Sequence, residues 1–222
     1  MNVFDIIGPV MIGPSSSHTA GAVRLGRVAS KLMDGKTPAR VEIILSGSFA
    51  QTYRGHGTDR ALLAGIMGYH SYSEEIRHAL TIARERGIDY EFIKKDIPGA
   101  HPNTARICYT LPDGSSGSVQ GASVGGGNIR VDLVNDMKVD FNGESHTLLV
   151  MHMDRPGVIA AVTSLMREKY AELNICNFHL SRERKGGQAI MTIEMDNLPP
   201  DTLMGDIRQL ENVTNALLIR RL

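Results

Sequence analysis

Three short segments in the first half of the chain concentrate side chains that can bind an anion or move a proton. They are Gly13-Pro14-Ser15-Ser16-Ser17-His18-Thr19, Gly55-His56-Gly57-Thr58-Asp59 and Ala100-His101-Pro102-Asn103-Thr104. Imidazole titrates near neutral pH and is the side chain that most often acts as a general acid or base. Hydroxyls and imidazoles clustered in this way indicate a site that binds a small charged molecule and transfers a proton.

The first of these segments lies where a helix is expected to begin. Apolar residues recur with helical spacing from Ala22 to Met33, and Ser17 or a neighbouring serine can cap the helix. Free N–H groups and the positive end of the helix dipole make such a terminus an anion site, which suits a carboxylate. A plain cap needs only one serine, so the additional hydroxyls and His18 favour a binding role.

The second and third segments present their histidines on loops. His56 stands between two glycines just before a helix expected from Thr58, so its imidazole can be approached from either side. A strand end that leads into a helix start is where α/β proteins place ligands. Pro102 biases His101 away from helical conformation and stiffens the presentation of His101 and Asn103. An ordinary turn is the alternative for this third segment.

Composition excludes several classes of protein. The chain has 24 Lys and Arg against 24 Asp and Glu, with no long run of like charge, which argues against nucleic-acid or anionic-membrane partners. No apolar run approaches the roughly 20 residues that span a bilayer. The first residues lack a secretory signal pattern, so we expect a cytoplasmic protein. The two cysteines, Cys108 and Cys176, are too few to hold a metal or cluster and are expected to be small buried residues.

Two other functions find little support. The glycine-rich segment over 123–128 matches neither GxGxxG after a strand nor the Walker pattern, so it indicates a tight turn rather than a nucleotide site. A metal hydrolase that uses His18, His56 and His101 would need a diagnostic spacing and a carboxylate beside them, and neither is evident.

The expected elements divide the chain into two parts. Helices and strands mix in the first, with strands over 41–45, 90–94, 106–111, 118–123 and 130–134 and further helices from Thr58 and over 73–86. The last third reads strand, helix, strand, strand, helix, strand, which is the ferredoxin-like order. The predicted class is α+β, with a mixed α/β substrate-binding-type domain over 1–145, a βαββαβ domain over 146–222 and a boundary near 142–147.

This second part resembles the ACT domain, a small-molecule regulatory module, in its element order and in the turn Asp154-Arg155-Pro156-Gly157. Pro156 fits the first turn of a helix, where its missing N–H costs nothing, and Gly157 permits close approach. The resemblance implies that Asp154, Pro156 and Gly157 contact a regulatory ligand and that the module pairs edge to edge in a homodimer. A purely structural docking domain is the alternative.

Nearly the whole chain resembles one family, the β subunit of the iron–sulfur-dependent L-serine dehydratase of two-subunit bacterial enzymes. The motifs that carry this resemblance are GPSSSHT from Gly13, GSFAQTYRGHGTD from Gly47, PGAHPNTARI from Pro98, SVGGGNI from Ser123 and MDRPGV from Met153. The first part is also similar to the allosteric-substrate-binding domain of some phosphoglycerate dehydrogenases, which binds ligands but performs no chemistry of its own.

The family resemblance implies a lyase that converts L-serine to pyruvate and ammonia. A [4Fe–4S] cluster acts on the departing hydroxyl as a Lewis acid, and a base removes the Cα proton. On the family pattern, the catalytic residues are His56, Thr58, His101 and Asn103, and the substrate-binding residues are Ser16, Ser17, His18, Thr19, Ser46 and Ser48. Either imidazole could be the base, and the accessibility of His56 favours it.

The sequence departs from single-chain members of the family, whose cluster cysteines lie in a segment that this chain lacks. The resemblance therefore implies a separate α subunit that ligates the cluster, no metal ligand in this chain, and no activity of the chain alone. The alternative from another class is a non-enzymatic amino-acid sensor, a binding domain joined to an ACT module. Two presented imidazoles beside threonine and asparagine favour the enzyme.

Overall fold

The structure is a computed structural model that describes residues 10–222. The chain forms two compact units that meet in sequence between Asn135 and Asp136, and each is described by itself. The expected domain boundary near 142–147 lies slightly further along the chain and stays a prediction. No helix among residues 10–222 is long and apolar enough to cross a membrane.

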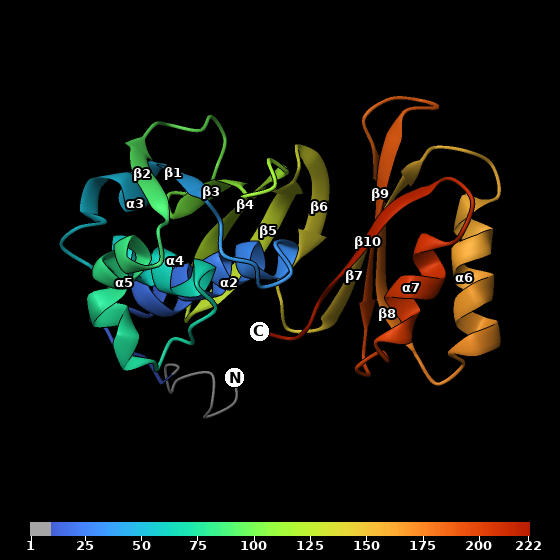
Figure 1. Cartoon of the computed structure of the whole chain (residues 1–222), viewed down its shortest axis with the longest axis horizontal. Coiled ribbons are helices and arrows are strands. Elements are labelled where there is room, and N and C mark those ends of the chain that lie inside the picture. Colours follow the sequence, from blue (N-terminus) through green and yellow to red (C-terminus); the bar gives the residue numbers. More distant parts are fainter. Residues whose placement is uncertain (1–9) are drawn as a thin grey trace. The chain divides into compact units, whose positions relative to one another are not determined.

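The first unit contains a mainly antiparallel sheet (Figure 1). Its strands are β1 (Arg40–Leu45), β2 (Asp89–Lys94), β3 (Thr104–Thr110), β4 (Ser116–Gly125) and β5 (Asn128–Val134). The hydrogen-bonded order of these strands is β2-β1-β3-β4-β5, in which β1 and β2 are parallel and β3 runs antiparallel to both β1 and β4. In β1 the alternate residues Val41, Ile43 and Leu45 are fully buried, as the predicted strand over 41–45 requires.

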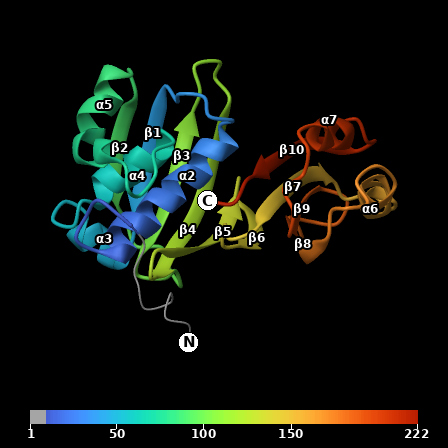
Figure 2. The ribbon, with the colours of Figure 1, turned by 90° about the horizontal axis from the view of Figure 1, so that it is seen from below.

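The helices of this unit are η1 (Ser16–Gly21), α2 (Ala22–Leu32), α3 (Gly47–Thr52), α4 (Thr58–Ile66), η2 (Glu74–His78) and α5 (Ala79–Glu85). Helix α2 packs on β3, β4 and β5, and α4 packs on α2 (Figure 2). Sequence patterning predicted all of these except α3. That helix has only six residues and begins at Gly47, whose φ is +55°. Because it is so short, the sequence shows no helical periodicity from which it could be predicted.

Helices α2 and α4 pack closely against each other at two glycines, Gly26 and Gly65. A Cβ atom at Gly26 would lie 2.3 Å from the carbonyl oxygen of Leu62, and one at Gly65 would lie 2.1 Å from that of Val23. No other residue type allows this approach without displacing a backbone. The contact matters for the site because α2 continues from the first polar segment and α4 begins at the end of the second.

Gly65→Ala is expected to lower the free energy of unfolding by about 1–3 kcal/mol, because the added methyl group over-packs the helix contact. The matched control is Gly205→Ala on α7, where a Cβ would meet nothing within 4 Å. There alanine should stabilise the chain by about 0.5–1 kcal/mol through helix propensity. Denaturant unfolding measures both; equal effects of the two substitutions would show that the helix contact does not require glycine.

The second unit begins with β6 (Met137–Phe141) and then has the predicted order: β7 (His146–Met153), α6 (Val158–Lys169), β8 (Ile175–Arg182), β9 (Gln188–Met195), α7 (Thr202–Arg208) and β10 (Val213–Ile219). The antiparallel sheet has the order β10-β7-β9-β8. Its core joins apolar residues of β7 and β9, such as Leu148 and Ile193, to Val162 of α6 and Ile207 of α7. The predicted α+β class and the βαββαβ order are confirmed.

Candidate active site

The first polar segment begins with a capped helical turn. Ser15 is the cap: its Oγ accepts a hydrogen bond from the His18 N–H at 3.3 Å, and its carbonyl accepts one from the Thr19 N–H at 2.8 Å. Residues 16–21 form a π-helical turn, a rare geometry that appears frequently at functional sites. A serine cap was predicted, and the structure assigns it to the first of the three serines.

His18 lies at the centre of the site. The residue is 9% exposed, and its Nδ1 and Nε2 lie 3.4 Å from the hydroxyls of Ser15 and Ser48, respectively. Its ring packs edge-on against Phe49 at 5.2 Å and against His56 at 4.7 Å between centroids. Burial, and then the neighbouring His56, lower the pKa of His18 below its ordinary value of 6.5. His18 is therefore neutral at neutral pH, and its ring packs against that of His56.

This lowered pKa gives the stability of the chain a defined pH dependence. The unfolded chain binds a proton at His18 more readily than the folded chain, so the favourable contribution is complete above the ordinary value of 6.5. It is lost as the pH falls from there through the lower, folded pKa. We expect His18→Gln to reduce the fall in melting temperature on acidification, whereas His78→Gln, an exposed change on η2, should not. Parallel pH profiles for wild type and His18→Gln would contradict this.

His56 is held in the turn between α3 and α4. Its N–H donates to the carbonyl of Thr52 at 3.0 Å, and Gly57, with φ of +72°, lets the chain enter α4. The side chain is exposed. Within residues 10–222, its ring contacts His18 and makes no hydrogen bond. Both ring nitrogens are thus available to a substrate.

The two residues after Gly57 are buried, in contrast to His56. Thr58 is fully buried, and within residues 10–222 its hydroxyl has no hydrogen-bond partner. Asp59 is 7% exposed and accepts a hydrogen bond from the Arg60 N–H at 2.8 Å. Burial is the main cause that raises the pKa of Asp59 above its ordinary value. In the free chain these two side chains can support the loop but do not face solvent.

The third segment is fixed from two sides. Asn103 donates from Nδ2 to the Ser123 carbonyl at 3.4 Å and accepts from the Ser123 N–H at 3.0 Å, which joins it to β4. The Pro102 carbonyl accepts from the Phe49 N–H at 3.3 Å. Since Phe49 also packs on His18, the third segment reaches the same cluster as the first two.

His101 has a defined tautomer. The Asn103 N–H donates to His101 Nδ1 at 3.1 Å, so this nitrogen carries the lone pair and the neutral ring carries its proton on Nε2. The outward nitrogen of His101 is therefore a hydrogen-bond donor. His56 has no such constraint, which distinguishes the two imidazoles that the sequence left as alternatives for the base.

The predicted serines take different places. The hydroxyl of Ser48 lies 3.4 Å from His18 Nε2, whereas the hydroxyl of Ser46 is buried and accepts a hydrogen bond from the Ile97 N–H at 3.0 Å. Ser16 and Ser17 are half-buried in the first turn of η1. The structure thus brings His18, Ser48 and His56 into contact.

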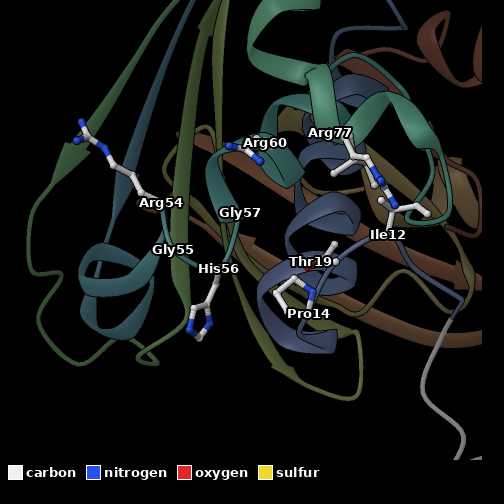
Figure 3. Close-up of a pocket in the computed structure, with 11 residues that line it drawn as sticks. Ile12, Pro14, Thr19, Arg54, Gly55, His56, Gly57, Arg60 and Arg77 are labelled. Carbon is white, nitrogen blue, oxygen red and sulfur yellow. The ribbon is translucent and has the colours of Figure 1, made fainter.

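A cavity of about 260 Å³ lies beside this cluster (Figure 3). It is lined by Ile12, Gly13, Pro14, Thr19, Arg54, Gly55, His56, Gly57, Arg60, Ile76 and Arg77. Three of these are arginines that the sequence analysis did not single out. Arg54 and Arg60 flank the Gly-His-Gly-Thr-Asp motif directly, which was an available signal. Arg77 comes from η2, and only the fold brings it there.

The comparisons with known proteins identify the family of this chain. Residues 2–87 match the family model of the serine dehydratase beta chain. The chain is 42% identical over 212 residues to a protein of Bacillus subtilis (strain 168) named probable L-serine dehydratase, beta chain, which covers 96% of this chain and 94% of that protein. The chain belongs to the L-serine dehydratase beta-chain family. The predicted family resemblance is confirmed.

Two further relatives match this chain over very different shares of their own length. The L-serine dehydratase beta chain of Peptoniphilus asaccharolyticus is 35% identical over 216 residues, which span 97% of this chain and 96% of that one. The D-3-phosphoglycerate dehydrogenase of Synechocystis sp. is 24% identical over 201 residues, 90% of this chain but only 35% of the relative. This beta chain therefore matches full-length beta chains, and it matches one part of a larger dehydrogenase.

The second unit of this beta chain uses Asp154 to hold a turn. Asp154 Oδ2 accepts from the Gly186 N–H at 2.9 Å and from Arg182 Nη1 at 2.8 Å, and these bonds, that of Gly186 first, lower the pKa of the carboxyl. Gly157 has a φ of +92° and starts α6, next to the exposed Pro156. The carboxylate of Asp154 is thus already engaged by the β8–β9 turn.

Proposed function

We propose that this chain is the β subunit of an L-serine ammonia-lyase, which converts L-serine to pyruvate and ammonia together with a separate α subunit. The observation that carries the proposal is the exposed His56 imidazole. It has no hydrogen bond within residues 10–222 and is supported by the neutral ring of His18. Names of relatives at 42% and 35% identity point to the same reaction.

In the proposed reaction His56 is the general base. It takes the Cα proton of L-serine, the Cβ–O bond breaks, and the departing hydroxide takes up one proton, so that the elimination releases one water molecule overall. The resulting aminoacrylate tautomerises to an imine, which water hydrolyses to pyruvate and ammonia. Imidazole is the side chain that most often acts as a general base. His101 contributes the opposite function, a hydrogen-bond donor at Nε2, and Asn103 fixes its orientation through its backbone N–H.

The substrate-binding and loop residues complete this assignment. We propose that four residues bind or face the substrate: Ser16, Ser17, Thr19 and Ser48. Ser46 and Thr58 do not touch the substrate in this proposal and instead hold their loops in position. The observations in favour are the bond from Ile97 to Ser46 and the full burial of Thr58. A buried side chain can position a neighbour without touching the substrate.

The part of the chain over 10–222 does not offer the set of thiolates that a [4Fe–4S] cluster needs. Among residues 10–222 no group of three His, Cys, Asp or Glu side chains could hold a metal. The expectation that both cysteines are buried was wrong, because Cys108 on β3 is only half-buried and Cys176 on β8 is exposed. We therefore propose that the partner α subunit ligates the cluster and that no residue of this chain is a metal ligand.

Product analysis tests the reaction. The chain mixed with its α subunit should release pyruvate and ammonia in equal amounts from L-serine. L-threonine, which has one more methyl group, should react more slowly by a factor of about 10–200 if the pocket excludes that group. Ammonia without an equivalent of 2-oxo acid would contradict the proposed elimination.

We also propose that the ACT-like unit forms a homodimer through β8. This strand lies at the edge of its sheet, and it exposes Phe178 and Leu180 at 38% and 39%. Exposed apolar edge strands are pairing surfaces. Asp154, Pro156 and Gly157 stay candidates for a regulatory ligand, with Asp154 acting through the β8–β9 turn.

Phe178→Lys is expected to shift the chain from dimer to monomer, because a charge on an edge strand opposes strand pairing. Leu198→Lys is the control, since Leu198 is also exposed but lies between β9 and α7. Light scattering after size-exclusion chromatography measures the mass of each. A dimeric Phe178→Lys variant would place the interface elsewhere.

A further inference from the structure

The cavity beside His56 has an unusual charge. Three guanidinium groups, those of Arg54, Arg60 and Arg77, belong to its lining, and no lining residue is acidic. Guanidinium stays protonated under all ordinary conditions. Arg77 has a counterion in Glu74, at 3.2 Å. Arg60 forms no salt bridge within residues 10–222, although the carboxyl of its neighbour Asp59, which does not line the cavity, interacts with it electrostatically. A cavity of this kind suits an anion and would repel a cation.

Figure 3 separates the three arginines by direction. In this view the side chain of Arg60 lies above Gly57, with Arg77 beside it to the right, whereas the side chain of Arg54 extends away from the other lining residues. Arg60 comes from the first turn of α4, directly after the loop that carries His56. Arg60 is thus the cationic group best placed to hold an anion in this cavity.

A buried hydroxyl provides an independent observation. Thr19 lines the cavity and is 2% exposed, and its Oγ1 has no hydrogen-bond partner within residues 10–222. Buried polar atoms almost always have a partner, so an orphaned one in a cavity wall points to a missing ligand. Gly13 leaves the room that this hydroxyl needs, because a Cβ there would lie 2.2 Å from Thr19 Oγ1.

We propose that this cavity is a carboxylate site in which Arg60 and the Thr19 hydroxyl hold the anion. A carboxylate offers two oxygens in the plane that guanidinium recognises with two parallel hydrogen bonds, and it can accept a third from the hydroxyl. Ile12, Pro14 and Ile76 provide an apolar wall for a short carbon skeleton. The cavity offers no carboxylate for an ammonium group, so the amino end of a zwitterion must lie outside it.

The carboxylate in this cavity can come from two sources. The first is the carboxylate of the substrate, which rests on the proposed function and would place the Cα atom toward the His56 loop. The second is a free carboxylate that fixes this loop without reacting. In both cases the anion contacts the glycine-flanked backbone around His56, since Gly55 and Gly57 line the same cavity.

The site itself is tested without activity. Propanoate, a carboxylate with no amino or hydroxyl group, is titrated into the full chain and its binding is followed by NMR. Arg60→Gln should weaken binding by about 10-fold or more, as expected for one charge-assisted contact. Arg40→Gln is the control, because Arg40 lies at the opposite end of β1 from Ser46 and pairs with Glu42, Asp89 and Glu91. Equal binding by the two variants, or none by the wild type, overturns the proposal.

Thr19→Val provides a second variant with two readouts. Removing a hydroxyl that has no protein partner should leave the melting temperature unchanged or raised, while propanoate binding weakens. A merely structural threonine would give a lower melting temperature and unchanged binding, which would count against the site.

Kinetics of the assembled complex identify the source. If the substrate carboxylate occupies the site, Arg60→Gln raises KM for L-serine by about 10- to 100-fold with kcat nearly kept, and Arg40→Gln changes neither. If propanoate binding weakens but KM does not change, the site takes a free carboxylate, and the proposal stands in that form. A wild-type complex that fails to convert L-serine refutes the proposed function alone, because propanoate binding decides the site independently.

Discussion

Replacing His56 by alanine is expected to lower kcat of the reconstituted complex by about 10²- to 10⁴-fold, the usual contribution of a general base. The side chain is exposed and makes no hydrogen bond within residues 10–222, so its loss should leave the melting temperature and assembly unchanged. Steady-state kinetics and thermal unfolding measure the two effects separately.

The same experiment separates an enzyme from an amino-acid sensor. A sensor would lose affinity or regulation on this substitution but would show no collapse of kcat. His78→Ala is the matched control, since His78 is also exposed but lies on η2 and does not line the cavity. A His56→Ala complex with wild-type turnover would remove His56 from the chemistry and return the base to His101.

The second large effect concerns the hydrogen-bonding pattern of His101. The side-chain amide of glutamine can place its N–H where Nε2 lies, whereas that of asparagine reaches only the Nδ1 position. The Asn103 N–H already occupies Nδ1, so only Nε2 of His101 can donate a hydrogen bond. We therefore expect His101→Gln to keep kcat within about 10-fold of wild type and His101→Asn to lower kcat by about 10²-fold or more.

A spectroscopic measurement supports this comparison. The ¹⁵N chemical shifts of the His101 ring should identify Nε2 as the protonated nitrogen in the neutral form. Nδ1 protonation, or an asparagine variant more active than the glutamine variant, would contradict the donor role and the Asn103 contact on which it rests.

Local sequence patterns were sufficient for most of the elements that carry the site. The helix after the serine-rich segment and the βαββαβ order follow from hydrophobic periodicity and turn residues, and both are present. Helix α3 could not be predicted, because a six-residue helix that starts at a left-handed glycine has no periodic signal.

The rest of the site depends on long-range contacts that no local pattern encodes. Arg77 joins the cavity because the segment at Ile12 runs beside the loop before η2, with the Ile12 N–H donating to Ser71 at 2.8 Å. Likewise, the sequence alone could not show that the Ser46 hydroxyl accepts a hydrogen bond from the Ile97 N–H or that His101 Nδ1 accepts one from the Asn103 N–H. Sequence motifs indicate which residues gather at a site, whereas the state of each ring nitrogen requires coordinates.

The most direct test of the central claim is an assay of L-serine conversion to pyruvate by this chain alone, by the α subunit alone, and by the two together. We expect conversion only by the mixture, because the proposed reaction takes its base and substrate contacts from this chain, whereas no group of three His, Cys, Asp or Glu side chains within residues 10–222 could hold a metal. Turnover by the purified chain without its partner would contradict it.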